Sequence, residues 1–212
     1  GRLINDMHHR IEMWASHFGL TATKWHGDVG KYQKDKFTKN PTDFLSTTPE
    51  SLEVILMNRT SGEKQKVFNN IKYILIASST GESALKLANA IDKDITIINV
   101  SHNVGFSGDN ESDISDEMIE KLEEVGIKTF QGLHAFSGAA RGVTNKYGGF
   151  SPLDVVADTL RMFSHGVKVA AEISIMAADA GLIPVGEEII AIGGRAHGVD
   201  TAVILTPVNS KN

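Results

Sequence analysis

Cysteine is absent from the 212-residue sequence, which excludes disulfide bridges, thiolate metal sites and a cysteine nucleophile. Long apolar runs are missing as well. No stretch approaches the roughly 20 residues that cross a bilayer, and the first residues lack the pattern of a signal peptide. We therefore expect a cytoplasmic protein without a membrane partner.

A strong charge of one sign is also lacking, because the net charge is only -5. Residues 1–70 carry a slight excess of Lys and Arg, whereas residues 71–212 carry a clear excess of Asp and Glu. The second part therefore does not favour nucleic acid as a partner. What is present, 41% hydrophobic and 22% charged residues, is sufficient for one sizeable domain or two small ones.

The most informative stretch is 71–87, where an apolar, β-branched run meets small hydroxyl residues and a helical pattern begins after Gly81. This order predicts a strand, a tight turn and a helix. Such a turn directs backbone N–H groups and the hydroxyls of residues 78–83 at one spot, which suits a phosphate, and Gly81 would let the backbone approach it. The alternative is an ordinary strand-to-helix turn with a capping Ser or Thr.

The first third contains alternating short elements. Apolar spacing predicts a helix over 3–18, ended by Gly19, and a helix is expected to start at Thr48, before Pro49. The remaining expected elements are strands over 21–26 and 43–47, a polar connection or helix over 27–40, and a short helix over 63–70.

From residue 71 the pattern is regular α/β with a mostly parallel sheet. Further strands are expected over 95–101, 127–130, 188–192 and 202–206, and further helices over 115–125, 151–165 and 167–180. Residues 132–149 read as a long glycine-rich connection. Ligands of such sheets bind outside the carboxyl ends of the strands. We therefore expect one pocket formed by loops 78–83, 101–106, 132–149 and 193–201.

Four segments of the first third resemble the first motor domain of large DEAD/DEAH-type helicases. They are Arg2-Leu3-Ile4-Asn5-Asp6-Met7, His26-Gly27-Asp28, Asn40-Pro41-Thr42-Asp43-Phe44-Leu45 and Thr47-Thr48-Pro49-Glu50-Ser51-Leu52-Glu53-Val54-Ile55-Leu56. The resemblance implies that Thr48 to Ser51 contact a nucleic-acid backbone. A phosphate-binding G-x-x-x-x-G-K-[ST] loop and an acidic D-E-x-H motif are both missing, which excludes a working helicase.

Residues 71–207 resemble the archaeal family similar to the C-terminal α/β domain of pyruvate kinase. The matching segments are Ala77-Ser78-Ser79-Thr80-Gly81-Glu82-Ser83-Ala84, Ser137-Gly138-Ala139-Ala140-Arg141-Gly142, 169–181, 191–194 and 198–202. The resemblance implies a three-layer α/β/α domain that holds FMN and has no assigned reaction. In pyruvate kinase the corresponding hydroxyl-rich loop holds the phosphate of a sugar bisphosphate effector.

Two parts follow from these resemblances: a partial, helicase-like α/β segment over 1–70, and a pyruvate kinase C-terminal-like domain over 71–212. Whether the first part packs on the second, replaces its first helix or is loosely attached stays open. The resemblance implies that residues 79–83 cradle the FMN phosphate and that Arg141 neutralises it or faces the flavin. The predicted cofactor-binding residues are Ser79, Thr80, Gly81, Glu82, Ser83, His102, His134, Ser137, Gly138, Arg141, Gly193, Gly194, Asp200 and Thr201.

Two buried-helix carboxylates, Glu172 and Asp179, are expected to be satisfied by backbone groups, although a buried carboxylate can carry a raised pKa. His197 and Asp200 lack a third ligand, so no metal site is predicted. No set of nucleophile, base and acid defines a reaction. The predicted function is binding of FMN or another small phosphorylated ligand, and the alternative is a nucleic-acid-associated helicase fragment. The oligomeric state, including a homo-oligomer, stays open.

Overall fold

The structure is a computed structural model that describes residues 2–40, 42–47, 51, 71–89, 91, 95–195 and 198–212. The predicted helices after Thr48 and over 63–70 lie outside these residues, apart from Ser51. The described strands are β1 (Ala22–Trp25), β2 (Phe44–Thr47), β3 (Tyr73–Ala77), β4 (Thr96–Ser101), β5 (Lys128–Gln131), β6 (Ile189–Gly193) and β7 (Thr201–Leu205). The described helices are α1 (Arg2–His17), α2 (Lys31–Lys39), α5 (Glu82–Ala88), α6 (Asp116–Glu124), α7 (Gly138–Tyr147), α8 (Pro152–Phe163) and α9 (His165–Asp179).

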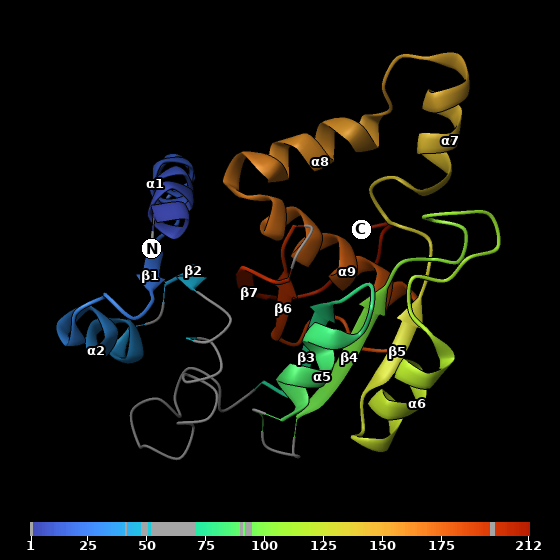
Figure 1. The fold of residues 1–212 in the computed structure, drawn as a ribbon. Helices are drawn as coiled ribbons and strands as arrows, with labels where there is room; N and C mark the ends of the chain where they lie inside the picture. The colour runs from blue at the N-terminus through green and yellow to red at the C-terminus, as the bar shows by residue number, and fades with distance from the viewer. Residues whose placement is uncertain are drawn as a thin grey trace.

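The described strands form one sheet in the order β1-β2-β7-β6-β3-β4-β5 (Figure 1). Pairing is parallel between β1 and β2 and throughout β6-β3-β4-β5, whereas β7 runs antiparallel to both of its neighbours. The mostly parallel α/β fold predicted from the sequence is confirmed.

Two hydrophobic clusters cover the two faces of the sheet, because successive strand residues point to opposite sides. Ile74 and Ile76 of β3 face α5 and α6, while Leu75 between them faces α9. On the second face α8 packs against α9, and α1 packs against α8 (Figure 1). The arrangement is therefore three-layered, with helices on both sides of the sheet.

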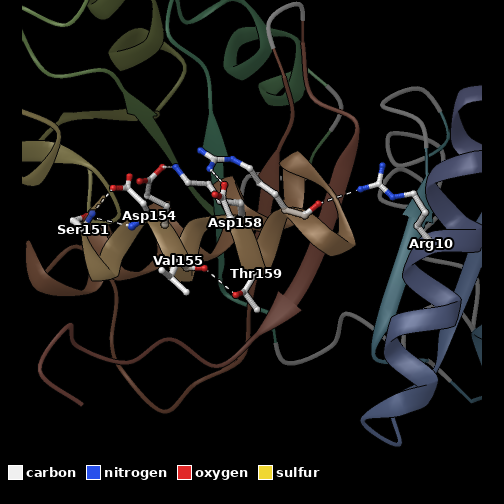
Figure 2. Close-up of polar contacts among 9 residues, drawn as sticks. Arg10, Ser151, Asp154, Val155, Asp158 and Thr159 are labelled. Atoms are coloured by element: carbon white, nitrogen blue, oxygen red, sulfur yellow. Dashed lines mark hydrogen bonds and ion pairs between the residues drawn. The ribbon is translucent and has the colours of Figure 1, made fainter. Parts of the chain in front are cut away.

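The first third joins the rest of the described chain through this sheet. Leu45 of β2 is the register partner of Ala202 of β7, and the Arg10 side chain of α1 donates to the Arg161 carbonyl oxygen of α8 at 3.2 Å (Figure 2). Among the three arrangements left open by the sequence, the structure has β1, β2 and α1 packed on the second part.

Helix ends follow the capping residues in the sequence. Ser115 and Ser151 cap α6 and α8, and Ser151 forms a reciprocal capping box with Asp154 (Figure 2). One expectation is wrong: residues 138–147, predicted as part of a glycine-rich connection, form helix α7. None of the α7 residues is buried, so the apolar spacing that identifies a packed helix is missing there.

Candidate functional site

A cavity of about 640 Å³ lies at the carboxyl ends of the parallel strands. Its lining includes Ser79 after β3, His102 after β4, His134 after β5 and Gly194 after β6. Helices α5, α7, α8 and α9 contribute the remaining wall. The four loops expected from the sequence to share a pocket therefore all contribute to this one.

The loop between β3 and α5 is fixed by its own hydroxyl groups. Ser78 Oγ accepts a hydrogen bond from the Ser83 backbone N–H at 3.2 Å, and Ser101 Oγ of β4 donates to the Ser79 carbonyl oxygen at 2.7 Å. Ser78 is buried, whereas Thr80 is exposed. The loop thus presents hydroxyl and backbone groups to the cavity from a rigid base.

Gly81 packs against the layer of α6. Its φ is +84°, and a Cβ at this position would lie 2.6 Å from Met118 Cγ and 3.0 Å from Ile114 Cδ1. Gly81 is also not part of the cavity lining. The glycine therefore permits close packing of the turn on the α6 layer.

His102 is held by a carboxylate on the cavity wall. Its Nδ1 lies 2.5 Å from Oδ2 of Asp113, which belongs to the loop after β4. Hydrogen bonds from Ser107 and from His102 hold the pKa of Asp113 below its ordinary value, so this carboxylate is ionised at neutral pH. His102 therefore has a fixed ring orientation and an anionic partner.

His134 lies beside His102, with ring centroids 5.3 Å apart, and stacks on Phe106 at 5.0 Å. Burial lowers the pKa of His134, which keeps the imidazole neutral at pH 7. Its Nδ1 is 3.7 Å from Glu172 Oε2, and its buried Nε2 has no hydrogen-bond partner among the described residues. The His134 ring lines the cavity, while this nitrogen itself is buried beneath the cavity surface.

Glu172 is the buried carboxylate of this wall. Its Oε2 accepts from Lys168 Nζ at 2.5 Å, and its Oε1 accepts from the Phe136 backbone N–H at 3.0 Å. The predicted backbone contact of Glu172 is thus present. Burial lowers the pKa of Lys168, and the Glu172 carboxylate opposes that shift. Asp179, in contrast, is exposed and accepts from the backbone N–H of Ser210 at 3.1 Å.

Cationic side chains from four helices line the cavity: Lys86 of α5, Arg141 of α7, Arg161 of α8 and Lys168 of α9. The acidic residues of its described lining are Glu82 and Glu172. Lys168 and Glu172 form an ion pair, and the remaining Lys86, Arg141 and Arg161 outnumber Glu82, so the wall carries a net positive charge. Such a cavity favours an anionic ligand.

The family model "Pyruvate kinase, alpha/beta domain" matches residues 64–205. The chain belongs to this family. Two solved structures of Cryptosporidium parvum pyruvate kinase are similar, one of them in complex with ADP. Both have a TM-score of 0.38 and 16% sequence identity over 76% of this chain, and the match covers 23% and 24% of their own length. This chain therefore spans about a quarter of the length of these relatives.

In this pyruvate kinase α/β domain, eight of the predicted binding residues line the cavity: Ser79, Thr80, Glu82, Ser83, His102, His134, Arg141 and Gly194. Gly193, Asp200 and Thr201 lie behind the wall instead. A Cβ on Gly166 would be 2.2 Å from Thr201 Oγ1, and one on Gly193 would be 2.6 Å from the Gly166 carbonyl oxygen. These residues let the first turn of α9 pack closely against β6 and β7.

Ser137 and Gly138 line a second, more open hollow of about 490 Å³ between α7, α8 and α9. His197 lies outside the described residues of the pyruvate kinase α/β domain. Among the residues that the structure does describe, no group of three or more side chains could hold a metal ion. No described helix is long and apolar enough to cross a membrane.

Sequence reasoning missed four cavity residues with charged or titratable side chains: Lys86, Arg161, His165 and Lys168. All four lie on helices, and polar side chains on a helix are ordinarily predicted to face the solvent. Lys168 did carry a signal, because it lies four residues before Glu172 on a strongly apolar helix. A charge pair within an apolar pattern indicates a buried pair.

Proposed function

We propose that this domain binds a phosphorylated small molecule in the cavity at the carboxyl ends of its parallel strands. The observation that carries the proposal is the convergence of Lys86, Arg141, Arg161 and Lys168 on the hydroxyl-rich loop after β3. A phosphate needs both elements: cations that offset its charge, and O–H or N–H donors for its oxygens.

The cations, rather than the helix dipole, are the main attraction for the anion. Helix α5 has only seven residues, and Gly81 at its N-cap is not part of the cavity lining. Lys168 is buried, and Arg161 is held by Asp158 Oδ1 at 2.6 Å (the ion pair of Figure 2). Partly buried cations of this kind are less screened by salt than cations on an open surface.

FMN is the first ligand of this class to test, and the residues fit it. The Phe106 ring, which is 41% exposed and stacks on His134, offers an aromatic face on which the flavin would stack. Ser79, Thr80 and Ser83, together with Lys86, would hold the phosphate. When bound, the flavin would supply electron-transfer chemistry, while the protein supplies orientation and charge.

The experiment is a titration of the purified chain with inorganic phosphate and with FMN, the latter followed by flavin fluorescence. We expect saturable binding that weakens as salt is raised. Arg141→Gln should reduce the affinity about 10-fold, because a charge-assisted hydrogen bond contributes roughly 1.5–3 kcal/mol and Arg141 is exposed.

The matched control is Lys146→Gln on the same helix. Lys146 lies over the Tyr147 ring and is not part of the cavity lining, so this variant should keep the affinity of the parent. Equal losses in both variants would mean only a general effect of surface charge. If neither phosphate nor FMN binds the parent chain, the proposed function is wrong.

A further inference from the structure

The Asp113 carboxylate holds the His102 ring, and binding of a phosphorylated ligand alone does not need such a pair. We infer that His102 is a general base, positioned by Asp113, which removes a proton from the carbon next to the carbonyl group of a phosphorylated α-hydroxycarbonyl compound. This inference rests on the proposed function, since the phosphate of the substrate is held by the same cavity.

The geometry assigns the two ring nitrogens of His102 different tasks. Nδ1 faces the ionised Asp113 carboxylate at 2.5 Å and therefore carries the hydrogen. Nε2 then carries the lone pair, on a side chain that lines the cavity and is about one-third exposed. An imidazole in this tautomer can accept a proton at Nε2, and the carboxylate stabilises the imidazolium that forms.

The pair is not required to anchor the loop after β4, because other contacts do so. Gln131 Nε2 of β5 donates to the His102 carbonyl oxygen at 3.2 Å and to Ser112 Oγ at 2.9 Å. The Gly105 backbone N–H donates to the Glu111 carbonyl oxygen at 2.8 Å. Because these bonds hold the loop, the contact between His102 Nδ1 and Asp113 Oδ2 can serve to orient the His102 ring and set its tautomer.

Charges near His102 suit the negative oxygen that this reaction creates. Removal of a proton beside a carbonyl group moves negative charge to the carbonyl oxygen, where fixed cations lower the barrier. Arg141 and Lys168 line the same cavity as His102 and lower the pKa of the neighbouring His134, while the Glu172 carboxylate, which is paired with Lys168, acts on that pKa in the opposite direction. His102, Arg141 and Lys168 therefore all border the same cavity.

The step is balanced without a further reactant. The C–H bond breaks, its hydrogen becomes the Nε2–H of an imidazolium, and its electron pair forms the C=C bond of an enolate. The carbonyl π electrons move to oxygen. Return of a proton from Nε2 to carbon regenerates the compound. In D₂O the imidazolium exchanges with solvent, so deuterium appears on that carbon.

The test uses dihydroxyacetone phosphate, a small compound of this class, with the full chain in D₂O. Proton NMR follows the loss of the C–H signal. We expect exchange well above the buffer rate, a loss of roughly 100-fold or more in His102→Gln, and a loss of roughly 10- to 100-fold in Asp113→Asn. His17→Gln on α1 and Asp109→Asn in the same loop should exchange as the parent does.

A second readout does not depend on turnover. The side-chain amide introduced by Asp113→Asn can donate to Nδ1 of His102, which moves the ring hydrogen to Nε2, and ¹⁵N NMR of the His102 ring distinguishes the two tautomers. We expect Nε2 without hydrogen in the parent and with hydrogen in Asp113→Asn, while inorganic phosphate binds both.

Two results separate this inference from the proposed function. If the chain binds phosphate but gives no deuterium exchange with saturating dihydroxyacetone phosphate, the inferred proton transfer is wrong and the binding function stands. If exchange is unchanged in His102→Gln, His102 is not the base. Failure to bind phosphate overturns both.

Discussion

At the scale of single residues, glycine and histidine positions decide how the cavity is built. Gly81 has a left-handed backbone, and its missing side chain leaves room for Met118 and Ile114 of the α6 layer. Gly105 has the same φ of +84°, but a Cβ there would meet nothing within 4 Å. Substitution at Gly105 therefore tests backbone strain alone, whereas substitution at Gly81 tests backbone strain together with steric overlap.

Gly81→Ala should lower the free energy of unfolding by about 2–3 kcal/mol, because it adds overpacking to an unfavourable φ. Gly105→Ala should cost only the backbone strain, about 1 kcal/mol. Urea denaturation of both variants and the parent measures the difference. An equal decrease in the free energy of unfolding for both variants would show that Met118 and Ile114 move aside for the added methyl group without an energetic penalty.

At the scale of elements, α1 is attached to the sheet through a buried histidine. His8 is 8% exposed, and its Nδ1 lies 3.4 Å from Ser46 Oγ of β2. Burial lowers the pKa of His8 below its ordinary value of 6.5, with nearby cationic groups acting in the same direction. The packed helix therefore favours the neutral ring.

This lowered pKa predicts a loss of stability in weak acid. The contribution of neutral His8 is complete above pH 6.5 and is lost as the pH falls from 6.5 through the lower pKa of the folded state. Burial shifts the pKa of His134 and His165 in the same direction. Urea denaturation should therefore give a lower midpoint at pH 5.5 than at pH 7.5. The decrease should be smaller in His8→Gln, and an equal decrease would contradict a role of His8.

Most elements could be predicted from the sequence because their boundaries carry local signals. Ser115 and Ser151 are N-caps, Gly126 follows α6, and the apolar runs of β3 and β4 are long enough to identify. Helix α7 could not be predicted, since it contains two glycines and no buried face. The cationic cavity residues on helices could not be predicted from the sequence either. Lys86, Arg161 and Lys168 meet only because α5, α8 and α9 surround the same strand ends.

At the scale of the whole molecule, the strands of the sheet differ in how many of their residues are paired with neighbouring strands. β3 is paired on both sides over several residues, with β4 and β6, whereas β2 has a single register partner on β7, Leu45 with Ala202. β1 lies at the edge beyond it. Local opening should therefore begin at the β1–β2 side.

Hydrogen exchange followed by mass spectrometry tests this gradient. Peptides covering Ile74–Ile76 and Ile190–Ile192 should be the slowest to exchange, and peptides covering Thr23–Trp25 should exchange earlier. Phosphate should slow exchange at residues 78–83 more than at β1. Uniform protection across all strands would contradict the uneven pairing.

The position of β7 between β6 and β2 also affects the order of events during synthesis. The strand that β2 needs as its neighbour begins about 150 residues later in the chain. At the usual speed of a ribosome this is a delay of roughly 8 to 30 s. During that time the edge of β2 that later pairs with β7 has unpaired backbone groups and is open to other nascent chains. Newly made molecules should therefore depend most on chaperones in that interval.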